Sequence, residues 1–240
     1  MLNENGNAVP CKCREGEIRK RRSNFAEIPE AFKDHTIKNF DTDIYKLDKS
    51  KMMINAVLKA VRYYIDDFEK QKENGMGLYL FSRTKGSGKT RMVASIANEL
   101  LNNYQVKFAT SPAIIAEIRG TYDKNSSVCQ TESQLLDFLI TSEILVIDDF
   151  GTEKITDWVN EKLYHIINER YIEKKVTIFT SNNEIGKCGY NPRIISRIQE
   201  RSYPIRFPEE SVREIIALKK QTDFITNAFD EERRNHADRN

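Results

Sequence analysis

The chain has 240 residues, of which 39% are hydrophobic and 31% are charged, a balance typical of one α/β domain with short extensions. Its formal net charge is only +2, so the charge of the whole chain does not by itself indicate nucleic-acid binding. No apolar run approaches the roughly 20 residues that cross a bilayer, and Met1 to Pro10 is polar, which excludes a membrane span and a secretory signal and predicts a cytoplasmic protein.

The first 23 residues form a basic segment that we expect to be flexible. Cys11 to Arg22 reads CKCREGEIRKRR, with six basic and two acidic residues, and such a run could either meet phosphates or be a solvated tail. Cys11 and Cys13 supply too few ligands for a structural zinc site, and we expect no metal there. Residues 24–50 then read as a helical turn and a linker, 51–226 as the folded domain, and 227–240 as a charged tail.

An alternation of strands and helices follows an amphipathic helix predicted at Met52–Phe68, which Asn74-Gly75 closes. In chain order the pattern predicts strand Gly77–Phe81, helix Lys89–Asn102, strand Val106–Thr110, helix Pro112–Tyr122, helix Thr131–Thr141, strand Glu143–Asp148, helix Thr156–Lys174, strand Val176–Ser181, helix Pro192–Arg201, strand Tyr203–Phe207 and helix Ser211–Phe224. Strands separated by helices predict an α/β fold of three layers, with a parallel five-stranded sheet between helices.

A glycine-rich loop between the first strand and its helix predicts a phosphate-binding P-loop. It ends in Gly86-Ser87-Gly88-Lys89-Thr90, whose amides, with that of Lys85, lie nearest the phosphates at the helix N-terminus. Lys89 would reach the β- and γ-phosphates, and the Thr90 hydroxyl would ligate magnesium. Counting back from Gly88, the first glycine of the usual motif falls on Arg83, so the turn after the strand is built differently.

Polar residues follow two further strands. The apolar segment Ile144 to Ile147 ends in Asp148 and Asp149, and we expect Asp148 to hold Mg²⁺ and Asp149 to orient and deprotonate a water. Asn182 follows the strand Val176–Ser181, where it would either face the γ-phosphate or be an ordinary turn residue.

Two further groups of residues are candidates on weaker patterns. Arg193 and Arg197 share one face of the helix Pro192–Arg201, which suits either an arginine donated across a subunit interface or a pair of surface arginines. Arg119, Tyr122 and Lys124 combine cations with an aromatic ring, as single-stranded DNA binders do, although such a segment is also a common helix end.

These parts in this order resemble AAA+ ATPases. The segments LVIDDFG, FTSN and RIISRI, with CKCREGEIRKRR and IPEAFKDHTIKNFD upstream, resemble the DnaC/DnaI helicase loaders and their relative, the IstB transposition helper, over about Cys11 to Arg213. The resemblance implies a P-loop NTPase fold with a reduced C-terminal lid. It also implies Asn182 as sensor 1, Arg197 as the arginine finger and Arg213 as a late arginine near the nucleotide.

The same resemblance implies ATP and Mg²⁺ as cofactors, and single-stranded DNA, the replicative helicase and further copies of the chain as partners. The function expected is a DNA-replication ATPase that loads or remodels the helicase. Two alternatives stay open. One is a transposition helper that assembles on duplex DNA. The other is a nucleotide-dependent adaptor or helicase inhibitor with little turnover, which Arg83, in place of the usual P-loop glycine, leaves open.

Overall fold

Five parallel strands form the centre of the molecule, in the order β2-β3-β4-β1-β5. The strands are β1 (Gly77–Phe81), β2 (Val106–Thr110), β3 (Ile144–Phe150), β4 (Val176–Ser181) and β5 (Ser202–Arg206). The computed structural model describes residues 17, 21–122 and 131–237, with side chains as far as 227. The predicted five-stranded parallel sheet is confirmed, and each strand lies within two residues of its predicted bounds.

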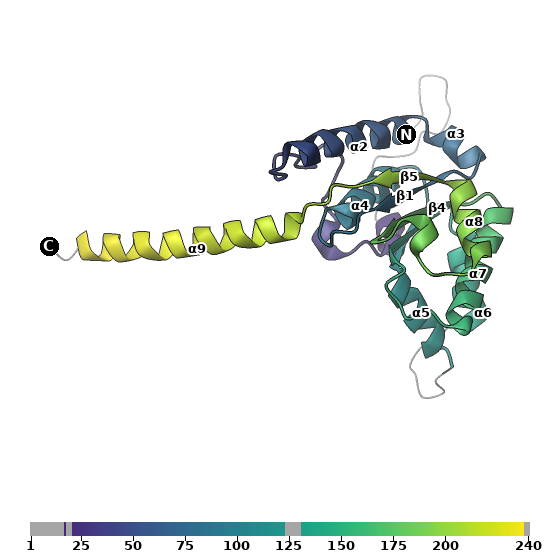
Figure 1. Cartoon of the computed structure of the whole chain (residues 1–240). Coiled ribbons are helices and arrows are strands. Elements are labelled where there is room, and N and C mark those ends of the chain that lie inside the picture. Colours follow the sequence, from purple (N-terminus) through teal and green to yellow (C-terminus); the bar gives the residue numbers. More distant parts are fainter. Residues whose placement is uncertain (1–16, 18–20, 123–130, 238–240) are drawn as a thin grey trace, which may run out of the picture.

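Helices cover both faces of this sheet and enclose two apolar clusters (Figure 1). One face carries α2 (Asp48–Asp66), α3 (Phe68–Glu73) and α4 (Lys89–Leu100), and the other carries α5 (Ser111–Gly120), α6 (Glu132–Thr141), α7 (Asp157–Ile172) and α8 (Pro192–Arg201). Along β1, Leu78 and Leu80 belong to the first cluster and Tyr79 to the second, because successive side chains of a strand point to opposite faces.

The amphipathic helix predicted at Met52–Phe68 differs from the structure at both ends. It begins at Asp48, because the Glu210 carboxylate accepts the backbone N–H groups of Lys46 (2.7 Å) and Leu47 (3.3 Å) and fixes the chain where it enters the helix. It ends at Asp66, since Asp67 leaves the helical region with φ −109° and ψ 29°, and the short α3 follows.

The last helix, α9 (Val212–Ala237), extends well past the predicted end at Phe224. No glycine or proline follows Phe224 in the sequence, so no residue there terminates the helix. Figure 1 shows α9 projecting away from the sheet and the other helices. It is the one helix after β5 in the described residues, which agrees with the reduced C-terminal lid that was expected.

Residues 24–50 pack closely on the domain. They include the end of a helical stretch that covers residues 21–26, the 3-10 turn η1 (Glu30–Phe32) and the start of α2. They bury Ala26, Ile28, Ile37, Phe40 and Tyr45 in the cluster beneath α2 and α4. This segment therefore reaches the carboxyl edge of the sheet, beside the loop between β1 and α4. No helix in the described part of the chain is long and apolar enough to cross a membrane.

Candidate functional site

The loop between β1 and α4 has the backbone of an anion cradle. Gly86 and Gly88 have φ of 75° and 98°, a region that favours glycine. A side chain at Gly88 would also place its Cβ 2.8 Å from Tyr45 Oη, and one at Gly86 would place it 2.9 Å from Arg213 Cβ. Tyr45 supports the loop from behind, since its hydroxyl donates to the Ser87 carbonyl at 2.8 Å. The amides of this loop and of the α4 N-terminus therefore suit bound phosphate.

Lys89 lies at the centre of the cradle. Its ammonium donates to the Ser82 carbonyl (3.3 Å), the Thr84 carbonyl (3.2 Å) and Ser87 Oγ (3.3 Å), so it is folded back on its own loop. Burial lowers the pKa of Lys89, and the nearby Asp149 and Asp148 carboxylates oppose that shift. A phosphate in the cradle would give this desolvated cation an anionic hydrogen-bond partner, in addition to the charges of the two nearby carboxylates.

One cavity of about 460 Å³ gathers most of the predicted residues. Its lining includes the loop residues 85–90 together with Asp149, Asn182 and Arg213, which the sequence places far apart. These meet because the loops after β1, β3 and β4 leave the same carboxyl edge of a parallel sheet. The structure therefore brings together the expected phosphate, water and late-arginine positions.

Six further residues border the same cavity and were not predicted from the sequence. They are Phe32, His35, Arg91, Thr152, Val212 and Ile216. The Phe32 and His35 rings pack edge to face with centroids 5.5 Å apart, and burial and the nearby Arg91 charge lower the pKa of His35. Phe32, Val212 and Ile216 add apolar side chains to the lining. In the sequence, the segment around Phe32 was marked only by its resemblance to helicase-loader sequences, and not by any pattern that indicates a binding site.

The Asp148 carboxylate lies against the first turn of α4. Thr90 Oγ1 donates to Asp148 at 3.1 Å, and Thr180 Oγ1 donates to it from β4. Burial raises the pKa of Asp148, and the neighbouring Asp149 charge raises it further, although the Thr180 bond opposes both. Carboxylate and hydroxyl oxygens are hard ligands, and a divalent cation would relieve this charge. Thr90 and Asp148 therefore fit the magnesium site that was expected.

Asp149 borders the cavity because β3 is irregular at its end. Asp149 has a positive φ of 54°, and the pairing of β3 with β4 shifts register between Ile147 and Phe150. The Asp149 amide donates to Thr180 Oγ1 at 2.9 Å, which anchors this turn. In a regular strand two successive side chains would point to opposite faces. Here both Asp148 and Asp149 lie at the Thr90 end of α4, as a metal ligand and a water-orienting base require.

Arg197 lies outside the cavity. On α8 its guanidinium donates to Asn168 Oδ1 (2.8 Å) and Tyr164 Oη (3.1 Å) of α7, and it stacks on the Tyr164 ring at 4.9 Å. Arg193, one turn earlier, is exposed. Neither arginine therefore serves this chain's own cavity, and the predicted role of Arg197 across a subunit interface stays a prediction.

The residues considered for DNA gather around one tryptophan. Arg119 lies over the Trp158 ring at 5.1 Å, and the Tyr122 ring lies 6.3 Å from it and is 54% exposed. Lys162, on the same helix as Trp158, approaches that ring at 6.0 Å. Trp158 and Lys162 were not predicted, although Trp158 is the one tryptophan of the sequence. Lys124, like Cys11 and Cys13, lies outside the described residues.

Comparison with known proteins gives a family model that matches residues 51–190, described as IstB-like ATP binding protein. The replicative helicase loader DnaI of Bacillus subtilis (strain 168) is 32% identical over 128 residues, which are 52% of this chain and 39% of that protein. The protein XkdC of the phage-like element PBSX, from the same strain, is 26% identical over 208 residues, 83% of this chain and 74% of XkdC. The match thus spans well under half of DnaI.

Two crystal structures have the same fold. DnaI superimposes with a TM-score of 0.61 at 24% identity, covering 76% of this chain and 95% of that one. The DnaC helicase loader superimposes with a TM-score of 0.60 at 22% identity, covering 75% of this chain and 100% of that one.

Proposed function

Because the chain belongs to the family of IstB-like ATP binding proteins and has the AAA+ P-loop fold, we propose that it binds and hydrolyses ATP to load or remodel a replicative helicase on single-stranded DNA. The observation that carries the proposal is the single cavity bordered by the P-loop, Asp149, Asn182 and Arg213. Its lining combines the apolar side chains of Phe32 and Ile216, which suit a base, with polar groups that suit a phosphate chain.

Each residue then has a definite task in hydrolysis. The loop amides and the Lys89 ammonium hold the phosphates, while Thr90 and Asp148 would hold Mg²⁺, which neutralises phosphate charge. Asp149 orients the attacking water and accepts its proton, and the Asn182 amide polarises that water. Arg213 adds positive charge at the wall of the cavity, next to Gly86.

The helicase partner is supported by DnaI, which is named a replicative helicase loader, and XkdC supports a role on a phage or another mobile element. The family description favours one alternative, an IstB-like transposition helper. That alternative requires a preference for duplex DNA over single strands. An adaptor without turnover would require ATP binding without hydrolysis.

The test is co-purification of the chain with the replicative helicase of its host, with and without ATP, using Asp149→Asn as a trapped form. We expect this variant to bind ATP and retain helicase, but to hydrolyse ATP about 100-fold more slowly, because the amide cannot accept the proton of the water. Phosphate release and pull-down measure the two effects. Hydrolysis at the wild-type rate would contradict the role of Asp149, and no helicase recovery in either nucleotide state would contradict loading.

We propose that the surface around Trp158 binds the DNA. Trp158→Ala should weaken binding of a single-stranded oligonucleotide by about tenfold, because Arg119 and the exposed Tyr122 lose the ring that positions them. Trp158→Phe keeps an aromatic ring and should retain most of the affinity. Fluorescence anisotropy measures both, with ATP affinity as the check on folding. Equal DNA binding by wild type and Trp158→Ala would place the DNA site elsewhere.

A further inference from the structure

The start of the P-loop poses a structural problem, because Arg83 stands where the motif usually begins with glycine. The structure builds this turn without a left-handed residue, since neither Arg83 nor Thr84 has a positive φ. An opening that lacks its usual glycine needs another group to fix its path.

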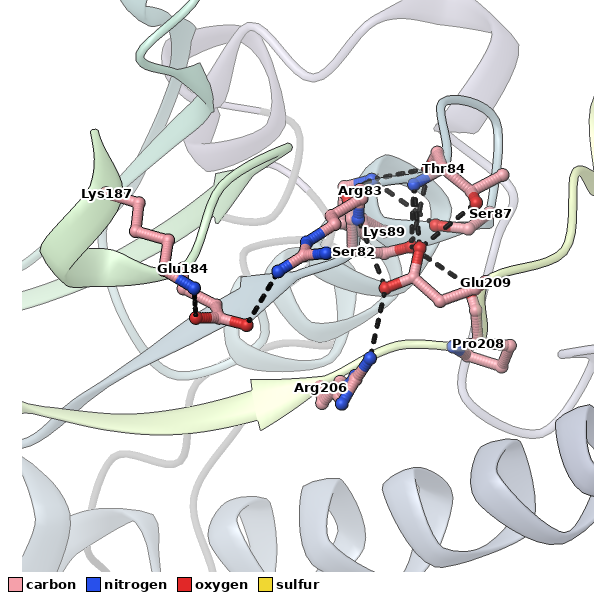
Figure 2. Close-up of polar contacts among 10 residues, drawn as sticks. All are labelled: Ser82, Arg83, Thr84, Ser87, Lys89, Glu184, Lys187, Arg206, Pro208 and Glu209. Carbon is pink, nitrogen blue, oxygen red and sulfur yellow. Dashed lines mark hydrogen bonds and ion pairs between the residues drawn. The ribbon is translucent and has the colours of Figure 1, made fainter. Parts of the chain in front are cut away.

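The Glu209 carboxylate, on the connection between β5 and α9, fills that role (Figure 2). Its Oε2 accepts hydrogen bonds from the Thr84 amide (2.9 Å), Thr84 Oγ1 (3.0 Å) and Ser82 Oγ (3.1 Å), and its Oε1 accepts one from the Arg83 amide (3.3 Å). Two successive amides and two hydroxyls thus converge on one carboxylate. These are the residues at which the loop leaves β1.

Glu209 is charged in this position. Burial raises its pKa, but the hydrogen bonds from Arg83 and Thr84 outweigh that effect and hold the pKa below its usual value. Bonds to an ionised acceptor are stronger than bonds between neutral groups. The exposed ion pairs nearby, Arg206 with Glu209 at 3.6 Å and Arg83 with Glu184 at 3.7 Å, contribute little by comparison.

The contacts of Glu209 lead directly to the phosphate-binding lysine. Lys89 donates to the carbonyls of Ser82 and Thr84. The same two residues donate to Glu209, through the Ser82 hydroxyl and the Thr84 amide. The first turn of α9, which follows the connection that carries Glu209, reaches the far end of the loop, where the Arg213 amide donates to the Gly86 carbonyl at 3.3 Å. The connection and the start of α9 therefore contact both the opening of the loop and its glycine turn.

We propose that Glu209 is a positioning residue for the nucleotide. Its carboxylate takes over the role of the missing glycine by holding residues 82–84, so that Lys89 and the amides of Gly86 to Thr90 converge on the phosphates. Glu209 acts through the loop and lines no part of the cavity itself. The inference rests on the proposed ATP binding and specifies how this chain builds that site.

The test compares Glu209→Gln with Glu214→Gln, an exposed glutamate a few residues later on α9. Glutamine keeps the shape of Glu209 but removes the charge and replaces one acceptor oxygen with an NH2 donor, which faces the amide of either Arg83 or Thr84. We expect ATP binding to weaken by about tenfold or more in Glu209→Gln, because a smaller fraction of molecules has the loop in the conformation that binds phosphate. ATP binding should be unchanged in Glu214→Gln. Calorimetry with ATP measures both.

Three further readouts separate positioning from general destabilisation. In the nucleotide-free chain, amide exchange at Arg83 and Thr84 should accelerate in Glu209→Gln while the melting temperature stays near wild type. KM for ATP should rise while kcat at saturation stays within about threefold. Thr84→Val, which removes one donor to Glu209, should weaken binding in the wild type and add little in the Glu209→Gln background.

The outcomes distinguish the two proposals. If Glu209→Gln binds ATP as tightly as the wild type does, the positioning role is overturned and the proposed function is left intact. A fall in kcat with KM unchanged would also overturn it, because that pattern indicates a group acting on the chemical step. A wild-type chain that binds no ATP would overturn the proposed function, and the inference with it.

Discussion

Lys89→Ala should reduce ATP affinity by about 100-fold or more, which at ordinary concentrations abolishes binding. The Lys89 ammonium would donate charge-assisted hydrogen bonds to phosphate, each worth about 1.5–3 kcal/mol. The variant also leaves the carbonyls of Ser82 and Thr84 without their donor. Both effects act on the phosphate end of the cavity.

Calorimetry measures this loss, with Lys219→Ala on α9 as the control. Lys219 is an exposed lysine outside the cavity lining, so its removal alters net charge equally without touching the loop. ATP affinity should therefore be near wild type in Lys219→Ala. Equal ATP affinity in wild type and Lys89→Ala would contradict the P-loop assignment, because removal of a lysine that contacts the phosphates must lower the affinity.

The phosphate end of the site could be predicted from the sequence because its parts are local. Gly86 to Thr90 identify a loop between a strand and a helix, Asp148 and Asp149 lie near the end of an apolar strand, and Asn182 follows the next strand. In a parallel sheet the carboxyl ends of the strands share one edge, so the alternating pattern alone brings such residues together. The cavity lining confirms that Asp149 and Asn182 reach the loop.

The apolar part of the cavity lining and the support of the loop could not be predicted because they depend on packing between distant segments. In the sequence, Phe32 and Ile216 are ordinary apolar residues. They line the cavity because residues 24–50 and α9 pack next to it. Glu209 reads as one carboxylate of a polar connection, and only the pairing of β5 with β1 brings it to Thr84. The left-handed φ of Asp149 likewise has no signal in LVIDDFG.

Arg197→Ala should leave ATP affinity of the isolated chain nearly unchanged and lower hydrolysis by roughly 10³-fold when DNA or helicase is present. The first expectation follows from its place on α8, outside the cavity of its own chain. The second follows if its guanidinium stabilises charge in a neighbour's site. Tyr164 and Asn168 hold this guanidinium in a fixed orientation at the surface, which suits a group presented to another subunit.

Arg193→Ala is the matched control, since Arg193 lies one turn away on the same helix and is exposed. Its removal should change hydrolysis by a few-fold at most, because the proposed interaction belongs to Arg197. A general loss of basic charge at the interface would instead lower both variants alike. Steady-state phosphate release, with ATP affinity measured in parallel, separates these two cases.

Mixing Arg197→Ala with Lys89→Ala tests whether the arginine acts between subunits. Each variant alone lacks one half of every shared site, but a mixed oligomer contains some sites in which an intact Lys89 meets an intact Arg197. Hydrolysis should therefore return in part, and it should return only in the presence of the DNA or helicase that assembles the chains. The rescued activity should rise and fall with the mixing ratio and be greatest near equal amounts. If mixing adds no hydrolysis beyond that of the separate variants, and Arg197→Ala alone hydrolyses ATP at the full rate, the arginine acts in no shared site, and its contacts with Tyr164 and Asn168 serve only to pack α8 against α7.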